Sequence, residues 1–198
     1  MSETLAEQVE IAHTPDEVRE QMHDQGYANL DFALDSRQRN SLFRSFKNFV
    51  QLTQEPGGEK LVDALAYKRN DLGNSAYFLT LRQPGIHNPH EDQREAGQDH
   101  KYIMHHGVQT TKRAEAALGE ALPREMENFL AKCDEFYFNA RIAAELGAKA
   151  LGIEKILLPE NEEDDVHLLR VIDYIASDSE ELGEAHFDRS AVTMACGE

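Results

Sequence analysis

The stretch 183-GEAHFDRSAVT-193, together with 168-LLRVIDY-174 before it, decides the expected fold of this chain. Both stretches are rich in β-branched and aromatic residues and are separated by acidic, turn-forming residues, a pattern typical of paired strands. We therefore predict strands at His167–Ile175 and Ala185–Ala195, joined by an acidic turn at Asp178–Glu184.

The second of these strands carries a candidate metal site. Side chains alternate along a strand, so His186 and Asp188 share one face while Phe187 takes the other. An imidazole and a carboxylate placed in this way can bind one metal ion, and a second histidine would complete the 2-His-1-carboxylate triad of non-heme iron oxygenases. From the His-x-Asp pattern alone, a surface histidine that happens to lie near an aspartate is the better interpretation.

Upstream, hydrophobic periodicity and helix end signals predict three helices, at about 14–25, 36–52 and 123–151. The first begins with a capping box formed by Thr14 and Glu17. Short strands are predicted at 27–32 and 76–81. Because helices come first and β-structure follows, the sequence predicts an α+β fold with the helices on one side of a sheet.

The amino-acid composition and net charge argue against some classes of binding partner. The chain has 198 residues and a formal net charge of −17, which argues against nucleic acid and anionic membranes as partners. Its two cysteines, Cys133 and Cys196, lie far apart without a CxxC pair, as expected in the reducing cytoplasm. Cys133 falls on the apolar side of the long helix and is predicted to be an inert core thiol. The Phe-rich stripe of the second helix is likewise predicted to be core.

The order LLRVIDY, turn, GEAHFDRSAVTMA resembles the core of the isopenicillin-N-synthase-like branch of the Fe(II)/2-oxoglutarate-dependent dioxygenases. That family shows an LRxxxY strand, a turn, and then G-x-HxD-x-(S/G)-x-x-T. The segments 25–30 and 99–107 resemble its earlier segments more loosely. The resemblance implies a double-stranded β-helix (jelly-roll) core, with a helical region and a few core strands at 1–160 and the first part of the jelly roll at 161–198.

Carried over residue by residue, the resemblance implies that His186 and Asp188 are iron ligands and that Tyr174 lies beside the cosubstrate or substrate. Strand alternation predicts that Tyr174 shares one face with Arg170 and Ile172, so it could line the interior of the barrel. A packed tyrosine whose hydroxyl is hydrogen-bonded elsewhere is an equally good interpretation. The activity implied is that of an enzyme with Fe(II) and 2-oxoglutarate. It would oxidise a small organic molecule with O₂ and release succinate and CO₂. Arg189 is expected to have a structural or surface role.

The chain also departs from the family pattern. The family's second histidine ligand and the Arg of its RxS motif would follow Glu198, so the jelly roll is expected to be incomplete at the C-terminus. Three alternatives stay open: an iron oxidase that needs no 2-oxoglutarate, a non-catalytic binding protein on the same fold, and an acidic interaction module. The substrate, the type of oxidation and the oligomeric state are not indicated by the sequence.

Five further histidines lie in one region, at positions 87, 90, 100, 105 and 106. They show no regular His–carboxylate spacing, so a second metal site is not favoured. His105 and His106 are predicted to line a substrate pocket or to form a simple surface pair.

Overall fold

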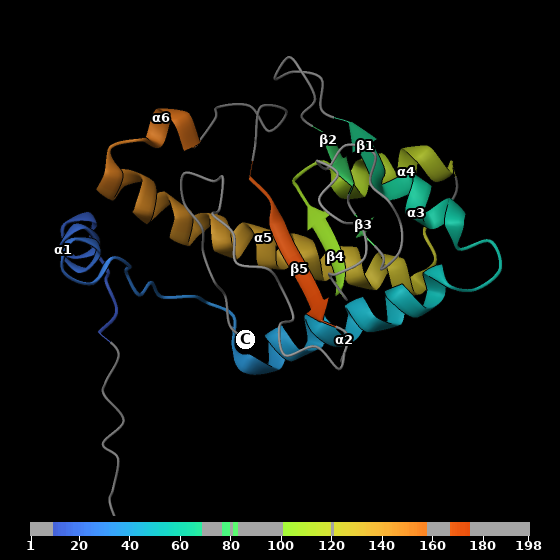
Figure 1. The fold of residues 1–198 in the computed structure, drawn as a ribbon, viewed down its shortest axis with the longest axis horizontal. Helices are drawn as coiled ribbons and strands as arrows, with labels where there is room; N and C mark the ends of the chain where they lie inside the picture. The colour runs from blue at the N-terminus through green and yellow to red at the C-terminus, as the bar shows by residue number, and fades with distance from the viewer. Residues whose placement is uncertain are drawn as a thin grey trace, which may run out of the picture.

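A computed structural model describes residues 10–68, 77–79, 81–82, 101–119, 121–157 and 167–174 (Figure 1). Its helices are α1 (Pro15–Gln25), α2 (Ser36–Thr53), α3 (Glu59–Leu65), α4 (Thr110–Leu118), α5 (Arg124–Leu151) and α6 (Glu154–Leu157). Its strands are β1 (Ala66–Lys68), β2 (Tyr77–Leu79), β3 (Leu81–Arg82), β4 (Lys101–His106) and β5 (Leu169–Tyr174).

Helix α1 begins and ends where its sequence signals predict. The Thr14 hydroxyl accepts a hydrogen bond from the backbone N–H of Glu17 at 3.2 Å, and the Glu17 carboxylate accepts one from the backbone N–H of Thr14 at 3.1 Å. The helix ends at Gly26, whose φ of 82° lies in the left-handed region that glycine adopts without steric cost. The predicted capping box is confirmed.

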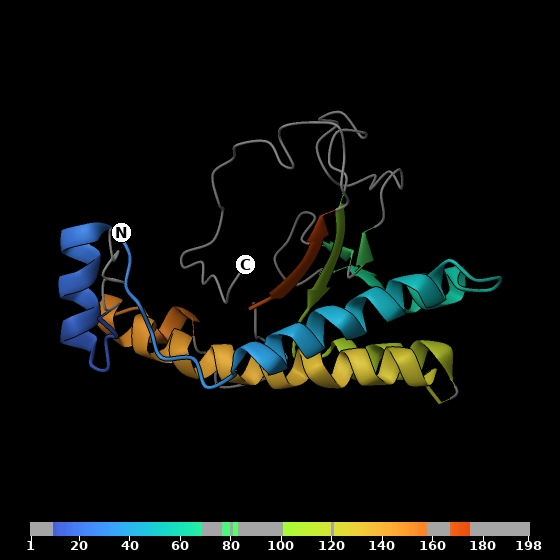
Figure 2. The same cartoon turned by 90° about the horizontal axis from the view of Figure 1, so that it is seen from below.

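Helices α2 and α5 form the central layer and run antiparallel, side by side (Figures 1 and 2). Phe129 of α5 stacks between two phenylalanines of α2, with ring centroids 5.1 Å from Phe46 and 5.3 Å from Phe49. All three rings are fully buried, because the apolar residues of both helices recur at helical spacing and meet along one stripe. The prediction that the Phe-rich stripe is core is confirmed.

A three-stranded antiparallel sheet, in the order β3-β4-β5, lies against one side of this helical layer (Figure 2). Met104 and Val171, which are paired across β4 and β5, are buried in the same hydrophobic cluster as Phe46 and Phe129. Two polar contacts to α2 add to this packing: the Gln54 side-chain amide donates to the Tyr102 hydroxyl, and Lys47 pairs with Asp173.

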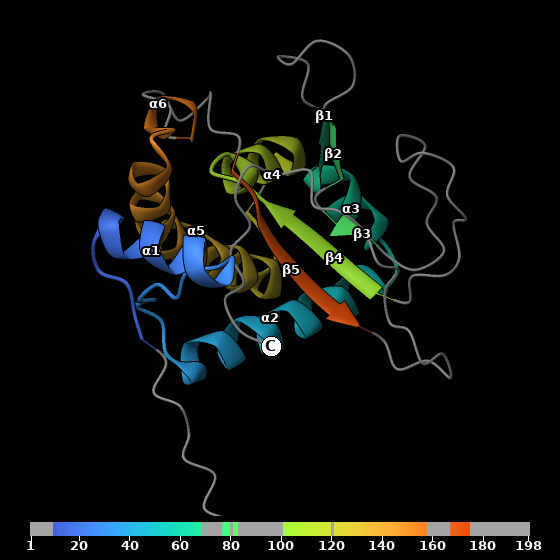
Figure 3. The same cartoon turned by 60° about the vertical axis from the view of Figure 1, so that its left-hand side comes forward.

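Helix α1 packs across the C-terminal part of α5, away from the sheet (Figure 3). Val18 of α1 and Ala150 of α5 are buried together in a small second cluster that includes Ala12. The Arg19 guanidinium donates a hydrogen bond to the carbonyl of Ala150 at 3.1 Å, close to the C-terminal end of α5. Cationic groups are favoured there by the helix dipole.

Several elements differ from the sequence prediction. The segment 27–32 forms only an isolated parallel bridge between Ala12 and Leu30. The strand predicted at 76–81 is divided between β2, which pairs with β1, and β3, which pairs with β4. Strand β4 was not predicted, because its lysine and histidines have low strand propensity and its partner β5 lies more than sixty residues later. Helices α3 and α4 were also missed.

The described residues combine helices with a two-stranded and a three-stranded antiparallel sheet. Strand β5 confirms the strand predicted at 167–175, and it pairs with β4, so residues from both sides of position 160 share one sheet. The strand predicted at 185–195 lies outside the described residues. The jelly-roll core therefore stays a prediction.

Candidate functional site

The two predicted iron ligands, His186 and Asp188, lie outside the described residues, as does Arg189. The third predicted site residue, Tyr174, is the last residue of β5 and is paired with Lys101 at the start of β4. Tyr174 thus occupies the end of the antiparallel ladder from which the chain continues toward the predicted ligands.

The β3-β4-β5 sheet has two faces of different chemistry, set by strand alternation and the observed register. We call one the helix face, because Tyr102, Met104, Leu169 and Val171 belong to the hydrophobic cluster of α2 and α5; it also includes His106 and Asp173. We call the other the far face; it includes Ile103, His105, Arg170 and Ile172, and Tyr174 is the next alternate position of β5.

The two faces differ in charge at the positions whose side chains the structure describes. His105 and Arg170 belong to the far face. The acidic residue of β5, Asp173, belongs to the helix face, where its carboxylate lies 3.5 Å from the Lys47 ammonium.

The centre of the far face is apolar. Ile103 of β4 is directly paired with Ile172 of β5, and Ile103 is only 7% exposed. Next to this pair, His105 is opposite Arg170, and the Arg170 side chain is exposed. The guanidinium of Arg170 makes no hydrogen bond or ion pair with the described residues. This face thus combines a buried isoleucine with an exposed arginine.

On the helix face, a buried polar cluster links β4, α4 and α5. The His106 ring is fully buried, and its Nε2 lies 2.8 Å from a carboxylate oxygen of Asp134 in the middle of α5. The other oxygen of Asp134 accepts a hydrogen bond from the Thr111 hydroxyl at 3.1 Å, in the first turn of α4. The Thr110 hydroxyl accepts from the backbone N–H of Gly107 at 2.9 Å. The Asp134 carboxylate therefore joins the end of β4 to the start of α4.

This cluster corrects one sequence interpretation. His106 is not part of a simple surface pair, because strand alternation turns it to the helix face with Tyr102 and Met104, where it also contacts the Tyr137 ring edge-on. His105, its neighbour, takes the far face. The Nδ1 atom of His106 is buried without a hydrogen-bond partner among the described residues. An aspartate on the apolar side of α5, directly after Cys133, was the sequence signal for a buried polar partner.

Cys133 is fully buried on α5, as predicted. Burial raises the pKa of its thiol well above the ordinary value of 9.0, and the negative charge of Asp134 adds to the increase. A thiol in this environment stays protonated at neutral pH, which makes it a poor nucleophile and a poor metal ligand.

Potential metal ligands are dispersed over the described part of the chain. Its His, Cys, Asp and Glu side chains nowhere gather in a group of three or more that could hold a metal ion. His87, His90 and His100 lie outside the described residues. The described histidines of β4 are separated onto opposite faces of the sheet, which prevents His105 and His106 from binding one ion together.

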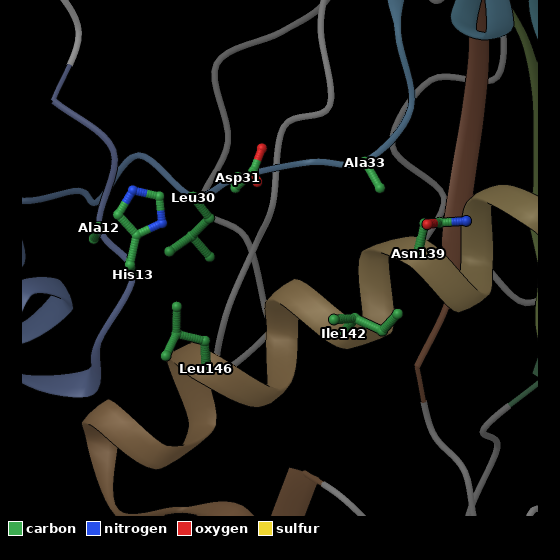
Figure 4. Close-up of a pocket in the computed structure, with 8 residues that line it drawn as sticks. All are labelled: Ala12, His13, Leu30, Asp31, Ala33, Asn139, Ile142 and Leu146. Carbon is green, nitrogen blue, oxygen red and sulfur yellow. The ribbon is translucent and has the colours of Figure 1, made fainter.

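A shallow hollow of about 290 Å³ lies between α5 and the two segments joined by the Ala12–Leu30 bridge (Figure 4). Its lining residues are Ala12, His13, Leu30, Asp31, Ala33, Asn139, Ile142 and Leu146. Ile142 is 68% exposed, so the floor of the hollow is open to solvent. No local sequence signal indicates that these segments meet.

Comparison with known proteins gave no match: no protein-family model, no curated protein and no solved structure is similar to this chain. Among the described helices, none combines the length and the apolar character that crossing a bilayer requires.

Proposed function

We propose that this protein is a non-heme Fe(II)- and 2-oxoglutarate-dependent oxygenase that oxidises a small organic molecule with O₂. The observation that carries the proposal is the spacing of Arg170, Tyr174, His186 and Asp188 along one strand–turn–strand sequence. The antiparallel strand β5, which ends at Tyr174, supports this proposal because the motif requires a strand at that point.

The donor set suits Fe(II), because a neutral imidazole and a carboxylate at alternate strand positions bind facially and leave other positions open. Bound iron and 2-oxoglutarate would supply the oxidising chemistry, with succinate and CO₂ as the products of the cosubstrate. The roles proposed for the chain are to hold the metal through His186 and Asp188 and to border the reacting molecule with Tyr174.

The helical layer would keep the sheet beside the proposed site in a fixed position. Helices α2 and α5 hold β4 and β5 through Met104, Val171 and the Lys47–Asp173 pair, which fixes one face of the sheet. A site on a rigid strand keeps its geometry better than one on a loop. The far face, which carries Tyr174 by register, would then border the pocket.

Two measurements on the protein, one spectroscopic and one of its products, test the proposal. Anaerobic Fe(II) with 2-oxoglutarate should give a weak visible charge-transfer band, and this band should be lost in His186→Ala. In air, O₂ uptake should be accompanied by succinate. Turnover without 2-oxoglutarate would instead indicate an oxidase of the isopenicillin N synthase type, and no band together with no uptake would favour a non-catalytic binding protein.

Two further properties belong to this proposal. The separated cysteines and the composition favour the cytoplasm, and the net charge of −17 favours a small-molecule substrate over nucleic acid or a membrane surface. An unchanged affinity for metal in His186→Ala would instead favour the interaction module, in which His186 and Asp188 are together by chance.

A further inference from the structure

We propose that the exposed side of α5 pairs with the same side of a second copy of this chain, antiparallel and with the two-fold axis at Ile142. This pairing is independent of the proposed function, because none of the predicted iron or cosubstrate residues belongs to α5.

The middle of α5 carries two large apolar side chains that are open to solvent. Phe138 is 49% exposed and Ile142 is 68% exposed, although the adjacent residues Tyr137 and Ala143 are buried. Leu146, one turn after Ile142, is half-buried and lines the same hollow (Figure 4). Large apolar side chains that lie together at the surface, rather than singly, mark interaction sites.

The exposed positions of α5 recur with the period of a helix–helix contact. Between residues 131 and 149 they are Ala131, Glu135, Phe138, Ile142 and Lys149, with successive spacings of four, three, four and seven residues. We call these five residues the exposed row. Spacings of four and three in alternation are those with which one helix packs along another, and the 28 residues of α5 give the exposed row its straight support.

The exposed row is complementary to itself under a two-fold rotation. In an antiparallel pair centred on Ile142, a residue before the centre lies opposite the residue equally far after it. Phe138 then faces Leu146 of the partner subunit, each four residues from the centre, and Glu135 faces Lys149 of the partner subunit, each seven residues from it. An apolar centre with opposite charges at its rim is the usual composition of a protein interface.

Charge also selects the direction and the kind of partner. A parallel pair would place Glu135 opposite Glu135 of the partner subunit, which is unfavourable, whereas the antiparallel pair matches acid with base at both ends. Since the same 15-residue segment, 135–149, supplies both members of each match, a second copy of this chain fits the exposed row without any further requirement.

The first test is sedimentation equilibrium of the 198-residue chain. A salt concentration of about 0.15 M screens the repulsion between two chains that each have a net charge of −17. Because the contact of one helix pair is small, protein concentrations of about 1 to 300 μM are needed. We expect the average mass to rise over this range from 22.4 kDa toward twice that value. A mass of 22.4 kDa at every concentration would overturn the proposal.

The second test changes the centre of the pair. Ile142→Glu would place two carboxylates at the two-fold axis and should weaken association by at least about tenfold. Tyr27→Glu is the matched control, because it makes the same change of charge at a side chain that is 58% exposed and lies outside α5. This control should associate as the unmodified chain does, and circular dichroism should show that both variants are folded. Undiminished association of Ile142→Glu would overturn the proposal, since the copies would then meet at another surface.

The third test concerns the antiparallel register. Glu135→Lys and Lys149→Glu should each weaken self-association by about fivefold, because each turns two opposite-charge pairs into like-charge pairs. An equimolar mixture of these two variants should associate about as tightly as the unmodified chain, since every lysine at the two positions then faces a glutamate of the other variant. Variants that associate no better together than apart would overturn the pairing centred on Ile142.

Discussion

The two faces of the β3-β4-β5 sheet are built from the same three strands and differ in almost every property. The helix face is buried against α2 and α5 and includes Met104, Val171 and the fully buried His106. On the far face, His105 lies opposite an exposed Arg170. Since consecutive residues alternate between these faces, neighbours such as His105 and His106 have unrelated surroundings.

This difference should separate the two faces in their contribution to stability. Residues of the helix face are packed against α2 and α5, so their replacement should lower the free energy of unfolding. The Arg170 side chain of the far face is exposed, so its replacement should leave that free energy almost unaffected.

The largest effect is expected from Met104→Ala. Met104 is fully buried within the main hydrophobic cluster, and removing such a side chain leaves a cavity that costs about 2–5 kcal/mol in the free energy of unfolding. Arg170→Ala, on the neighbouring strand and the other face, should change this free energy by no more than about 0.5 kcal/mol. Urea denaturation followed by circular dichroism measures both. Equal losses for the two variants would remove the distinction between the faces.

The second effect concerns the polar cluster of the helix face. Asp134→Ala would leave His106 Nε2 and the Thr111 hydroxyl without their shared partner, at a cost of about 1–3 kcal/mol. Glu135→Ala is the matched control, because the carboxylate of this neighbouring acid of α5 accepts an exposed hydrogen bond from the Gln38 side chain. The same denaturation measurement applies. A loss for Glu135→Ala as large as for Asp134→Ala would show that the cluster contributes nothing specific.

The third effect concerns the rate at which the Cys133 thiol reacts. Because burial and then Asp134 raise the pKa of the Cys133 thiol, its thiolate is scarcer at pH 8 than that of an exposed cysteine. In a Cys196→Ser background, Cys133 should react with a disulfide reagent at least about 100-fold more slowly in the native chain than in denaturant. Fast labelling of the native chain would mean that the interior of the helical layer is open to solvent.

How far the sequence predicts these features depends on whether the cause is local. The ends of α1, α2 and α5 follow from capping residues and 3.6-residue periodicity, which can be read within a few turns, and they were predicted to within about two residues. Strand β4 was missed because Lys101, His105 and His106 are poor strand formers individually. Only pairing with β5, far along the chain, stabilises them there.

The same limit applies to the candidate site. The roles of Tyr174, His186 and Asp188 are implied by a resemblance to a known family, and of these residues only the backbone of Tyr174 lies within the described part of the chain. Of the two interpretations of His106, the simple surface pair is wrong, because this residue is buried against Asp134, which belongs to a different element. The opposition of His105 and Arg170 is set by the register of two distant strands, for which the sequence has no local signal.

The smallest effect is expected in α1, which packs on α5 outside the sheet and so serves as a reference for the two faces. The hydrogen bond from the backbone N–H of His13, and a second from that of Thr14, hold the pKa of Glu17 below its ordinary value of 4.5. A lowered pKa means that the carboxylate stabilises the α1 N-terminus fully above pH 4.5 and less as the pH falls through the lowered value. An NMR pH titration of the His13 and Thr14 amides should therefore show a midpoint below 4.5, and this transition should be absent in Glu17→Gln and retained in the control Glu20→Gln. A midpoint at or above 4.5 would contradict the capping geometry, and a simultaneous shift of the β4 and β5 amides would show that α1 and the sheet are not independent.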